Sequence, residues 1–122
     1  MTTTKTTTQA SQEHETCKKR MLPVRDALEV LNGKWKLPIM LSISFGAKRF
    51  KQISKDVGDI TDKMLSKHLK ELETNQLIIR KVYDTFPPTV EYSITEHGMT
   101  LRKVIKELAD WGQIHRNKII GH

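Results

Sequence analysis

The sequence predicts a mainly α-helical fold with one small β-hairpin. Apolar residues recur at helical spacing through most of the chain, as Leu65, Leu69 and Leu72 do at i, i+4 and i+7. After Asn75 the pattern changes to two short segments rich in β-branched and aromatic residues, separated by paired prolines. Two short helices joined by a glycine-containing turn and followed by a hairpin indicate a winged helix-turn-helix.

Length and composition bound the possibilities further. A chain of 122 residues predicts one domain, and a core of this size often gains burial by dimerisation. The formal net charge of +7 favours nucleic acid or an anionic membrane surface as a partner. The first residues lack the apolar segment of a signal peptide, and the longest apolar-rich run, residues 37–45, is too short to span a bilayer. We expect a cytoplasmic protein with no membrane partner.

The N-terminal part divides into a tail and a first pair of helices. Residues 1–16 are rich in Thr, Ser and Gln and nearly free of apolar residues, which predicts a disordered tail preceding a domain over residues 17–122. Pro23 suits the first turn of a helix that ends near Asn32. A second helix is expected over residues 36–44.

The helix-turn-helix itself is predicted over residues 50–74. Arg49 and Phe50 suggest a short strand, and residues 50–57 a small helix that buries Phe50, Ile53 and Val57. Gly58 breaks this helix, and Thr61 is a good N-cap for the next one, which runs over residues 61–74.

The hairpin and a last helix complete the domain. Residues 77–83 and 90–95 predict the two strands of a wing over residues 77–95, with a turn at the paired prolines between them. In the second strand, alternating apolar and polar residues predict one buried face. Thr95 then caps a long helix expected to reach about residue 119.

Cations and hydroxyls gather on the exposed side of the helix over residues 61–74. From residue 48 to residue 81 there are nine Lys or Arg against five Asp or Glu. A charge run of this kind is usually a solvated helix face, but its place in a winged helix-turn-helix favours double-stranded DNA. We predict that the N-terminal part of the helix reads base edges in the major groove, that a later lysine meets phosphate, and that the wing strand supplies further cations. The predicted contacts are Thr61, Lys63, Ser66 and Lys67 for bases, Lys70 for phosphate, and Arg80 and Lys81 from the wing, of which Arg80 better suits a narrow minor groove.

Metal and catalytic sites are not indicated. His14 and Cys17 form a single H-x-x-C pair with no second pair at ligand spacing. His68 lies at the edge of the leucine stripe and is expected to pack rather than to bind a ligand. The sequence contains no glycine-rich phosphate loop or nucleophile elbow. We therefore predict that the protein is not an enzyme and needs no cofactor.

The last helix has more apolar surface than a small domain needs for its own core. We expect it to pair two subunits together with the first helix, so that each copy of the domain meets one half of a pseudo-palindromic operator. Packing within a single chain is the alternative. The predicted interface residues are Leu28, Leu101, Ile105, Leu108 and Trp111.

Many short motifs in the same order resemble the HxlR family of bacterial winged helix-turn-helix regulators, which are relatives of the MarR type. The resemblance covers about residues 23–112. It is carried by Pro23-Val24, Ala27-Leu28, Gly33-Lys34-Trp35, Arg49-Phe50, Lys63-Met64-Leu65-Ser66, Leu69, Leu72, Pro87-Pro88, Val90-Glu91-Tyr92-Ser93, Thr95 and Trp111-Gly112. It implies a homodimer formed by the first and last helices, a recognition helix in the major groove, wings on the flanking minor groove, and control of transcription, often in response to electrophiles, oxidants or aldehydes.

One departure from the family pattern concerns sensing. Members commonly have a cysteine just before the proline, whereas Leu22 stands there in this chain and the only cysteine is Cys17. The resemblance therefore does not extend to a thiol switch at this position, and a small-molecule effector or no effector are the alternatives. A winged-helix module that binds an acidic protein instead of DNA is the competing function.

Overall fold

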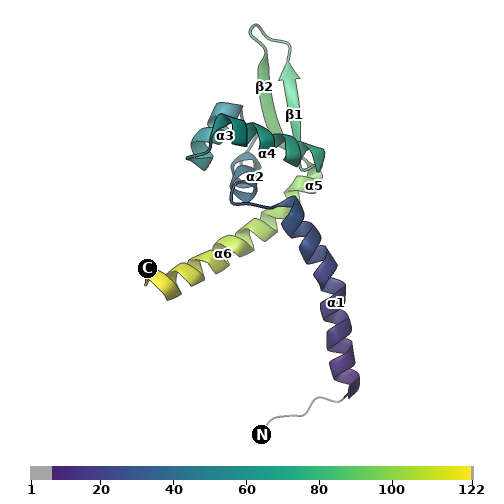
Figure 1. Ribbon diagram of the computed structural model, residues 1–122. Helices are drawn as coiled ribbons and strands as arrows, with labels where there is room; N and C mark the ends of the chain where they lie inside the picture. The colour runs from purple at the N-terminus through teal and green to yellow at the C-terminus, as the bar shows by residue number, and fades with distance from the viewer. Residues whose placement is uncertain (1–6, 122) are drawn as a thin grey trace. The chain divides into compact units, whose positions relative to one another are not determined.

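The computed structural model describes residues 7–121 of the chain. The chain divides into two compact units, Met1–Asn32 and Gly33–His122. The described part of the first unit is the helix α1 (Thr7–Val30), and the second unit contains all the other helices and both strands (Figure 1).

Helix α1 differs from the prediction at its start. It begins at Thr7 and holds Pro23 in its interior, so the predicted start at Pro23 is wrong. Residues 9–21 contain no Gly or Pro and several straight-chain residues of high helix propensity, so nothing in the sequence ends the helix before Pro23. The helix also covers residues 7–16, where the sequence predicted disorder, and the rest of that predicted tail, residues 1–6, lies outside the described residues.

The helix-turn-helix follows the prediction closely. Helix α2 (Lys36–Ser44), α3 (Phe50–Val57) and α4 (Asp62–Thr74) have the expected bounds. The expected strand at Arg49 and Phe50 is wrong, because Phe50 already begins α3 and only Lys48 forms a β-bridge, to Tyr92. The backbone N–H of Arg49 donates to the side-chain oxygen of Gln52 at 2.8 Å, which closes the first turn of α3 at this point.

The core of the second unit is built around α2, which contacts α3, α4, α6 and β2. Its residues Ile39, Met40 and Ile43 are completely buried. The other buried apolar side chains are Ile53, Ile60, Leu65, Leu69, Leu72, Leu77 and Ile78. Phe50 and Val57, which were expected to be buried, are only half-buried. Apolar side chains from α2, α3 and α4 thus fix the helix-turn-helix on one central helix.

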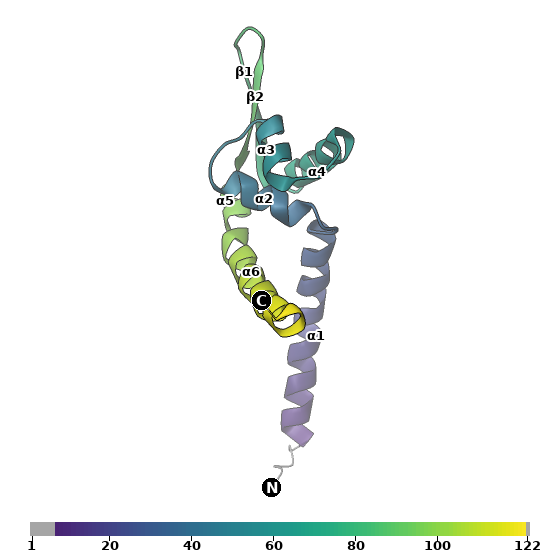
Figure 2. The same cartoon turned by 90° about the vertical axis from the view of Figure 1, so that its left-hand side faces the viewer.

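The wing is an antiparallel pair, β1 (Ile78–Tyr83) and β2 (Thr89–Ile94). It extends well beyond α3 and α4 (Figure 2). Every residue of β2 is half-buried, so the alternation predicted for this strand does not appear as one buried and one exposed face. Helices α2, α3 and α5 all contact β2, so its residues are partly covered although none is fully buried.

The C-terminal part forms two helices where the sequence predicted one. Thr95 caps the short helix α5 (Glu96–Met99), and α6 (Leu101–Ile120) follows after Thr100. The Thr95 hydroxyl accepts from the N–H of Gly98 at 2.9 Å and donates to the carbonyl oxygen of Gln76 at 2.6 Å. The first turn is thereby tied to the start of the wing, and Gly98, a poor helix former, lies where the two helices separate.

Candidate nucleic-acid interface

Helix α4 has two sharply different sides. Leu65, Leu69 and Leu72 are buried against the rest of the unit. The side chains predicted to contact DNA from this helix and its cap are all exposed, namely Thr61, Lys63, Ser66, Lys67 and Lys70. A helix with a free polar face of this kind can enter a groove about 12 Å wide without unpacking its apolar side.

Thr61 has a defined structural task at the start of α4. Its backbone is extended, and its side-chain oxygen accepts from the N–H of Met64 at 3.1 Å. This hydrogen bond satisfies one of the free donors of the first turn. The hydroxyl hydrogen is not used in this contact, so Thr61 still has a donor to offer to a base or a phosphate.

The wing presents two further cations. Arg80 lies opposite Tyr92 and Lys81 opposite Glu91 in the hairpin register. Neighbouring residues of a strand point to opposite faces, yet both side chains are exposed because the hairpin is uncovered. The ammonium of Lys81 lies 5.0 Å from the centre of the Tyr83 ring, which holds it on one face of the strand.

Two polar contacts join α2 to the two helices of the helix-turn-helix, α3 and α4. The Ser42 hydroxyl of α2 donates to the Asp56 carboxylate of α3 at 2.7 Å, and the Lys48 ammonium is paired with the same carboxylate. Hydrogen bonds from Lys48 and Ser42 lower the pKa of Asp56. Lys48 is one of the nine basic residues between positions 48 and 81. Its ammonium is neutralised by Asp56 within the fold.

The second contact joins α2 to α4. Lys36 is buried, with 2% of its side chain exposed, and its ammonium pairs with the Glu71 carboxylate. A hydrogen bond from Lys36 lowers the pKa of Glu71. His68 lies one turn before Glu71 and is buried, as the sequence predicted for a packing residue. Burial and the nearby charge of Lys36 lower the pKa of His68.

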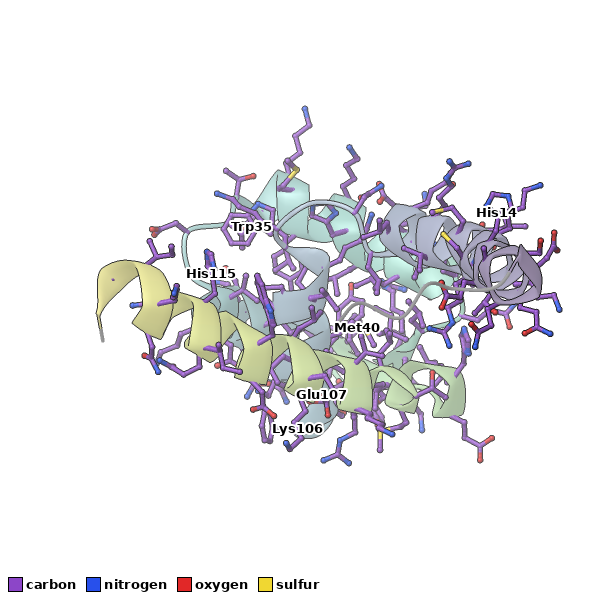
Figure 3. The ribbon with its side chains drawn as sticks, turned by 90° about the horizontal axis from the view of Figure 1, so that it is seen from below. His14, Trp35, Met40, Lys106, Glu107 and His115 are labelled. Carbon is purple, nitrogen blue, oxygen red and sulfur yellow. The ribbon has the colours of Figure 1, made fainter. Side chains whose placement is uncertain are left out.

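The residues predicted for the dimer interface lie on exposed surface. Helix α6 has no fully buried residue among those the structure describes; Leu108 and Trp111 are exposed, and Leu101 and Ile105 are half-buried. Lys106 and Glu107 lie on the opposite side of the α6 ribbon from Met40 (Figure 3). In α1, Leu28 is exposed as well. Each helix thus has an apolar surface that its own unit leaves uncovered.

Two residues with a place in this region were missed by the sequence analysis. Lys36 follows Trp35 in a stretch that suggested only a helix start, and a lysine at a helix N-terminus, where the dipole disfavours a cation, was the available signal. Phe86, in the loop at the tip of the wing, is fully exposed. The paired prolines that follow Phe86 predict a turn, but they do not predict an exposed aromatic ring.

Other kinds of site are not found in the part of the chain described. Residues 7–121 bring together no group of three or more His, Cys, Asp or Glu that could hold a metal ion. Among the same residues no helix is both long enough and apolar enough to cross a membrane.

Comparisons with known proteins agree with this architecture. Residues 30–119 match the family described as HxlR-like helix-turn-helix. YtcD of Bacillus subtilis (strain 168), named an uncharacterized HTH-type transcriptional regulator, is 39% identical over 104 residues, covering 85% of this chain and 82% of that protein. YdeP of the same organism, with the same description, is 42% identical over 97 residues, covering 80% and 76%.

A comparison with solved structures shows the same fold. The redox regulator HypR in its reduced form superimposes with a TM-score of 0.76 at 37% identity, covering 82% of this chain and 99% of that chain. The predicted winged helix-turn-helix fold is thereby confirmed, and membership of a family of transcriptional regulators implies DNA binding and not catalysis. The chain belongs to the HxlR-like helix-turn-helix family of transcriptional regulators.

Proposed function

We propose that this regulator binds a pseudo-palindromic operator in double-stranded DNA as a homodimer. Helix α4 lies in the major groove, and the wing of β1 and β2 lies on the flanking minor groove. The observation that carries the proposal is the two-sided nature of α4, whose leucines are buried while its hydroxyls and lysines are exposed.

The position of each side chain supports its role. Lys63, Ser66 and Lys67 lie in the N-terminal half of α4, the part that reads base edges in helix-turn-helix proteins. Lys70 lies a turn further along and meets phosphate. On the wing, Arg80 enters the minor groove, where a narrow groove attracts a guanidinium, and Lys81 adds a phosphate contact.

The uncovered surface of α6 supports the dimer. Leu101, Ile105 and Leu108 recur at helical spacing, and 61% of the Trp111 side chain is exposed. An apolar stripe of this kind is stabilised by burial against a second copy. A two-fold pair of domains then meets half-sites about 34 Å apart, one turn of DNA.

A salt titration tests the DNA-binding part of the proposal. The affinity of the purified protein for a duplex enriched from random sequence should fall linearly on a log–log plot against salt, because each phosphate contact releases counterions. A shuffled duplex of the same composition is the control and should bind more weakly. If neither duplex binds while an acidic protein does, the chain is a protein-interaction module and the proposal is wrong.

A further inference from the structure

The ion pair between Lys36 and Glu71 is not explained by the electrostatics of either helix. Lys36 is the first residue of α2, where the helix dipole disfavours a cation, and Glu71 lies in the last turn of α4, where it disfavours an anion. Removing an ammonium from water is costly unless it is paired. Only 2% of the Lys36 side chain is exposed, so the residue requires its partner on α4.

The backbone carbonyl of Glu71 also takes part in the C-terminal cap of α4. Both the N–H and the side-chain amide of Asn75 donate to the Glu71 carbonyl oxygen, each at 3.0 Å. The Glu71 side chain reaches Lys36 from this capped turn. The ion pair therefore holds the C-terminal end of α4, while the side chains proposed to read bases lie toward the other end.

The Glu71 carboxylate is hydrogen-bonded to Lys36 and not to the neighbouring His68. Its Nδ1 atom is 4.0 Å from the Glu71 Oε2 atom, the same oxygen that Lys36 contacts, and no hydrogen-bond partner of Nδ1 is present among the described residues. The imidazole is buried and its pKa is lowered, so at neutral pH it carries no positive charge to compete with the Lys36 ammonium for this oxygen. Lys36 thus supplies an ionic link from α2 to this end of α4.

Apolar packing holds α4 against the rest of the unit, and the ion pair adds a polar contact at one end of the helix. Leu65, Leu69 and Leu72 anchor the helix by a non-directional effect, whereas an ion pair with hydrogen bonds fixes an orientation. At 1.5 Å per residue the helix is about 20 Å long, so a tilt of roughly 10° about one end moves the other end by about 3 Å. Hydrogen bonds to base edges do not survive a displacement of that size.

We propose that Lys36 is a positioning residue, whose pair with Glu71 sets the angle at which α4 is presented to DNA without Lys36 touching the DNA. The inference rests on the proposed function, because it assumes that α4 reads bases. Only the Lys36 end of the pair is buried, while 37% of the Glu71 side chain is exposed. Replacing a buried ion pair by apolar residues is often neutral or stabilising, and a partly exposed pair contributes less still to stability. We therefore expect the pair to determine sequence selectivity more than stability.

The test compares Lys36→Met with Lys34→Met. Both remove one positive charge from the same segment, but Lys34 is exposed, with its ammonium 4.8 Å from the centre of the Trp35 ring. The measured quantity is the ratio of affinities for the enriched and the shuffled duplex, with the melting temperature alongside. Lys36→Met should lower the ratio about tenfold, as one lost base contact would, and Lys34→Met should leave it at the wild-type value. An unchanged ratio in Lys36→Met overturns the inference.

A double variant covers the case in which Lys36→Met does not fold. Lys36→Met with Glu71→Met removes both charges together, so neither is left unpaired, and its melting temperature should equal or exceed that of the wild type. A lowered ratio in this folded variant supports the positioning role, and a wild-type ratio overturns it. Ser66→Ala and Lys67→Ala distinguish a failure of this inference from a failure of the proposed function, because unchanged selectivity in both variants contradicts the proposed reading of bases by α4 itself.

Discussion

Gly98 of α5 lies so close to the backbone of Leu77 that a β-carbon on Gly98 would come within 2.2 Å of the Leu77 carbonyl oxygen. The same β-carbon would lie 2.6 Å from the Ile94 Cγ1 atom. Leu77 directly precedes β1 and Ile94 ends β2. The close packing of α5 against the base of the wing therefore depends on the absence of a side chain at residue 98.

We predict that Gly98→Ala destabilises the protein. The atom in the way is a backbone oxygen, which cannot rotate aside, so the wing base or α5 must shift. Overpacking of this kind costs about 1–3 kcal/mol. Chemical denaturation of the variant should give a lower midpoint than that of the wild type.

Gly112→Ala is the matched control, since it makes the same change in another helix. A β-carbon at Gly112 meets no atom within 4 Å among residues 7–121. The substitution should stabilise α6 by about 0.5–1 kcal/mol through helix propensity. Equal stability of Gly98→Ala and the wild type would show that the wing base yields easily, contrary to the geometry.

Such contacts mark the limit of what the sequence predicts. The leucine spacing of α4, the Thr61 cap and the change of period after Asn75 are local patterns, and they gave the helix-turn-helix and wing within about a residue. The attachment of α5 to the start of the wing depends on Thr95 bonding to Gln76, a contact between segments far apart in the sequence. The burial of Lys36 likewise depends on where α4 packs, and the pattern of apolar residues in α2 does not predict it.

Substitutions on the exposed side of α4 should have two different effects on DNA binding, one for residues that read bases and another for a residue that contacts phosphate. Ser66→Ala and Lys67→Ala should change the base preference in selection from random duplex, because both side chains are exposed in the N-terminal half of α4. Each lost specific contact should cost about 1–3 kcal/mol. Lys70→Ala should weaken binding to all sequences alike and lower the salt slope by about one. Unchanged selected sites and affinities in all three variants would mean that α4 does not read DNA.

The dimer makes a separate prediction at Leu108. Its side chain is exposed in the single chain, so Leu108→Glu should be harmless to an isolated subunit. In a dimer formed through α6 the same change buries an unpaired charge and should give monomers or aggregates. Light scattering measures the outcome. Arg102→Glu, an exposed charge change on the same helix, is the control and should remain dimeric. A monomeric wild type at micromolar concentration would exclude the dimer.

His68 predicts a dependence of stability on pH. Burial, followed by the charges of Lys36 and Lys67, holds the pKa of His68 below its ordinary value of 6.5, against the opposing effect of Glu71. Between the two pKa values the unfolded chain binds the proton more tightly than the folded chain, so stability rises with pH there. The contribution is complete above about pH 6.5 and is lost as the pH falls from 6.5 through the lowered pKa.

The measurement is the melting temperature from neutral pH down to about pH 5. His68→Gln should flatten the fall that the wild type shows below pH 6.5, because glutamine does not titrate. His97→Gln removes a histidine from an exposed position and should not flatten it. Parallel curves for the wild type and His68→Gln would assign the pH dependence to other groups.

The last prediction is that oxidation does not control DNA binding in this protein. HypR, to which the chain is similar, is described as a redox regulator, with structures in reduced and oxidized forms. The position before Pro23, where the family commonly has a cysteine, is the exposed Leu22, and a leucine forms neither a sulfenic acid nor a disulfide. Cys17 is the only thiol, and it is exposed on α1. Operator affinity should be measured for the wild type and Cys17→Ser, each before and after mild treatment with peroxide or diamide. We expect four equal affinities, because the Cys17 thiol is exposed and belongs to a different unit of the chain from α4 and the wing. Loss of binding on oxidation in the wild type alone would contradict this prediction and would place the sensor at Cys17, upstream of the family's usual position.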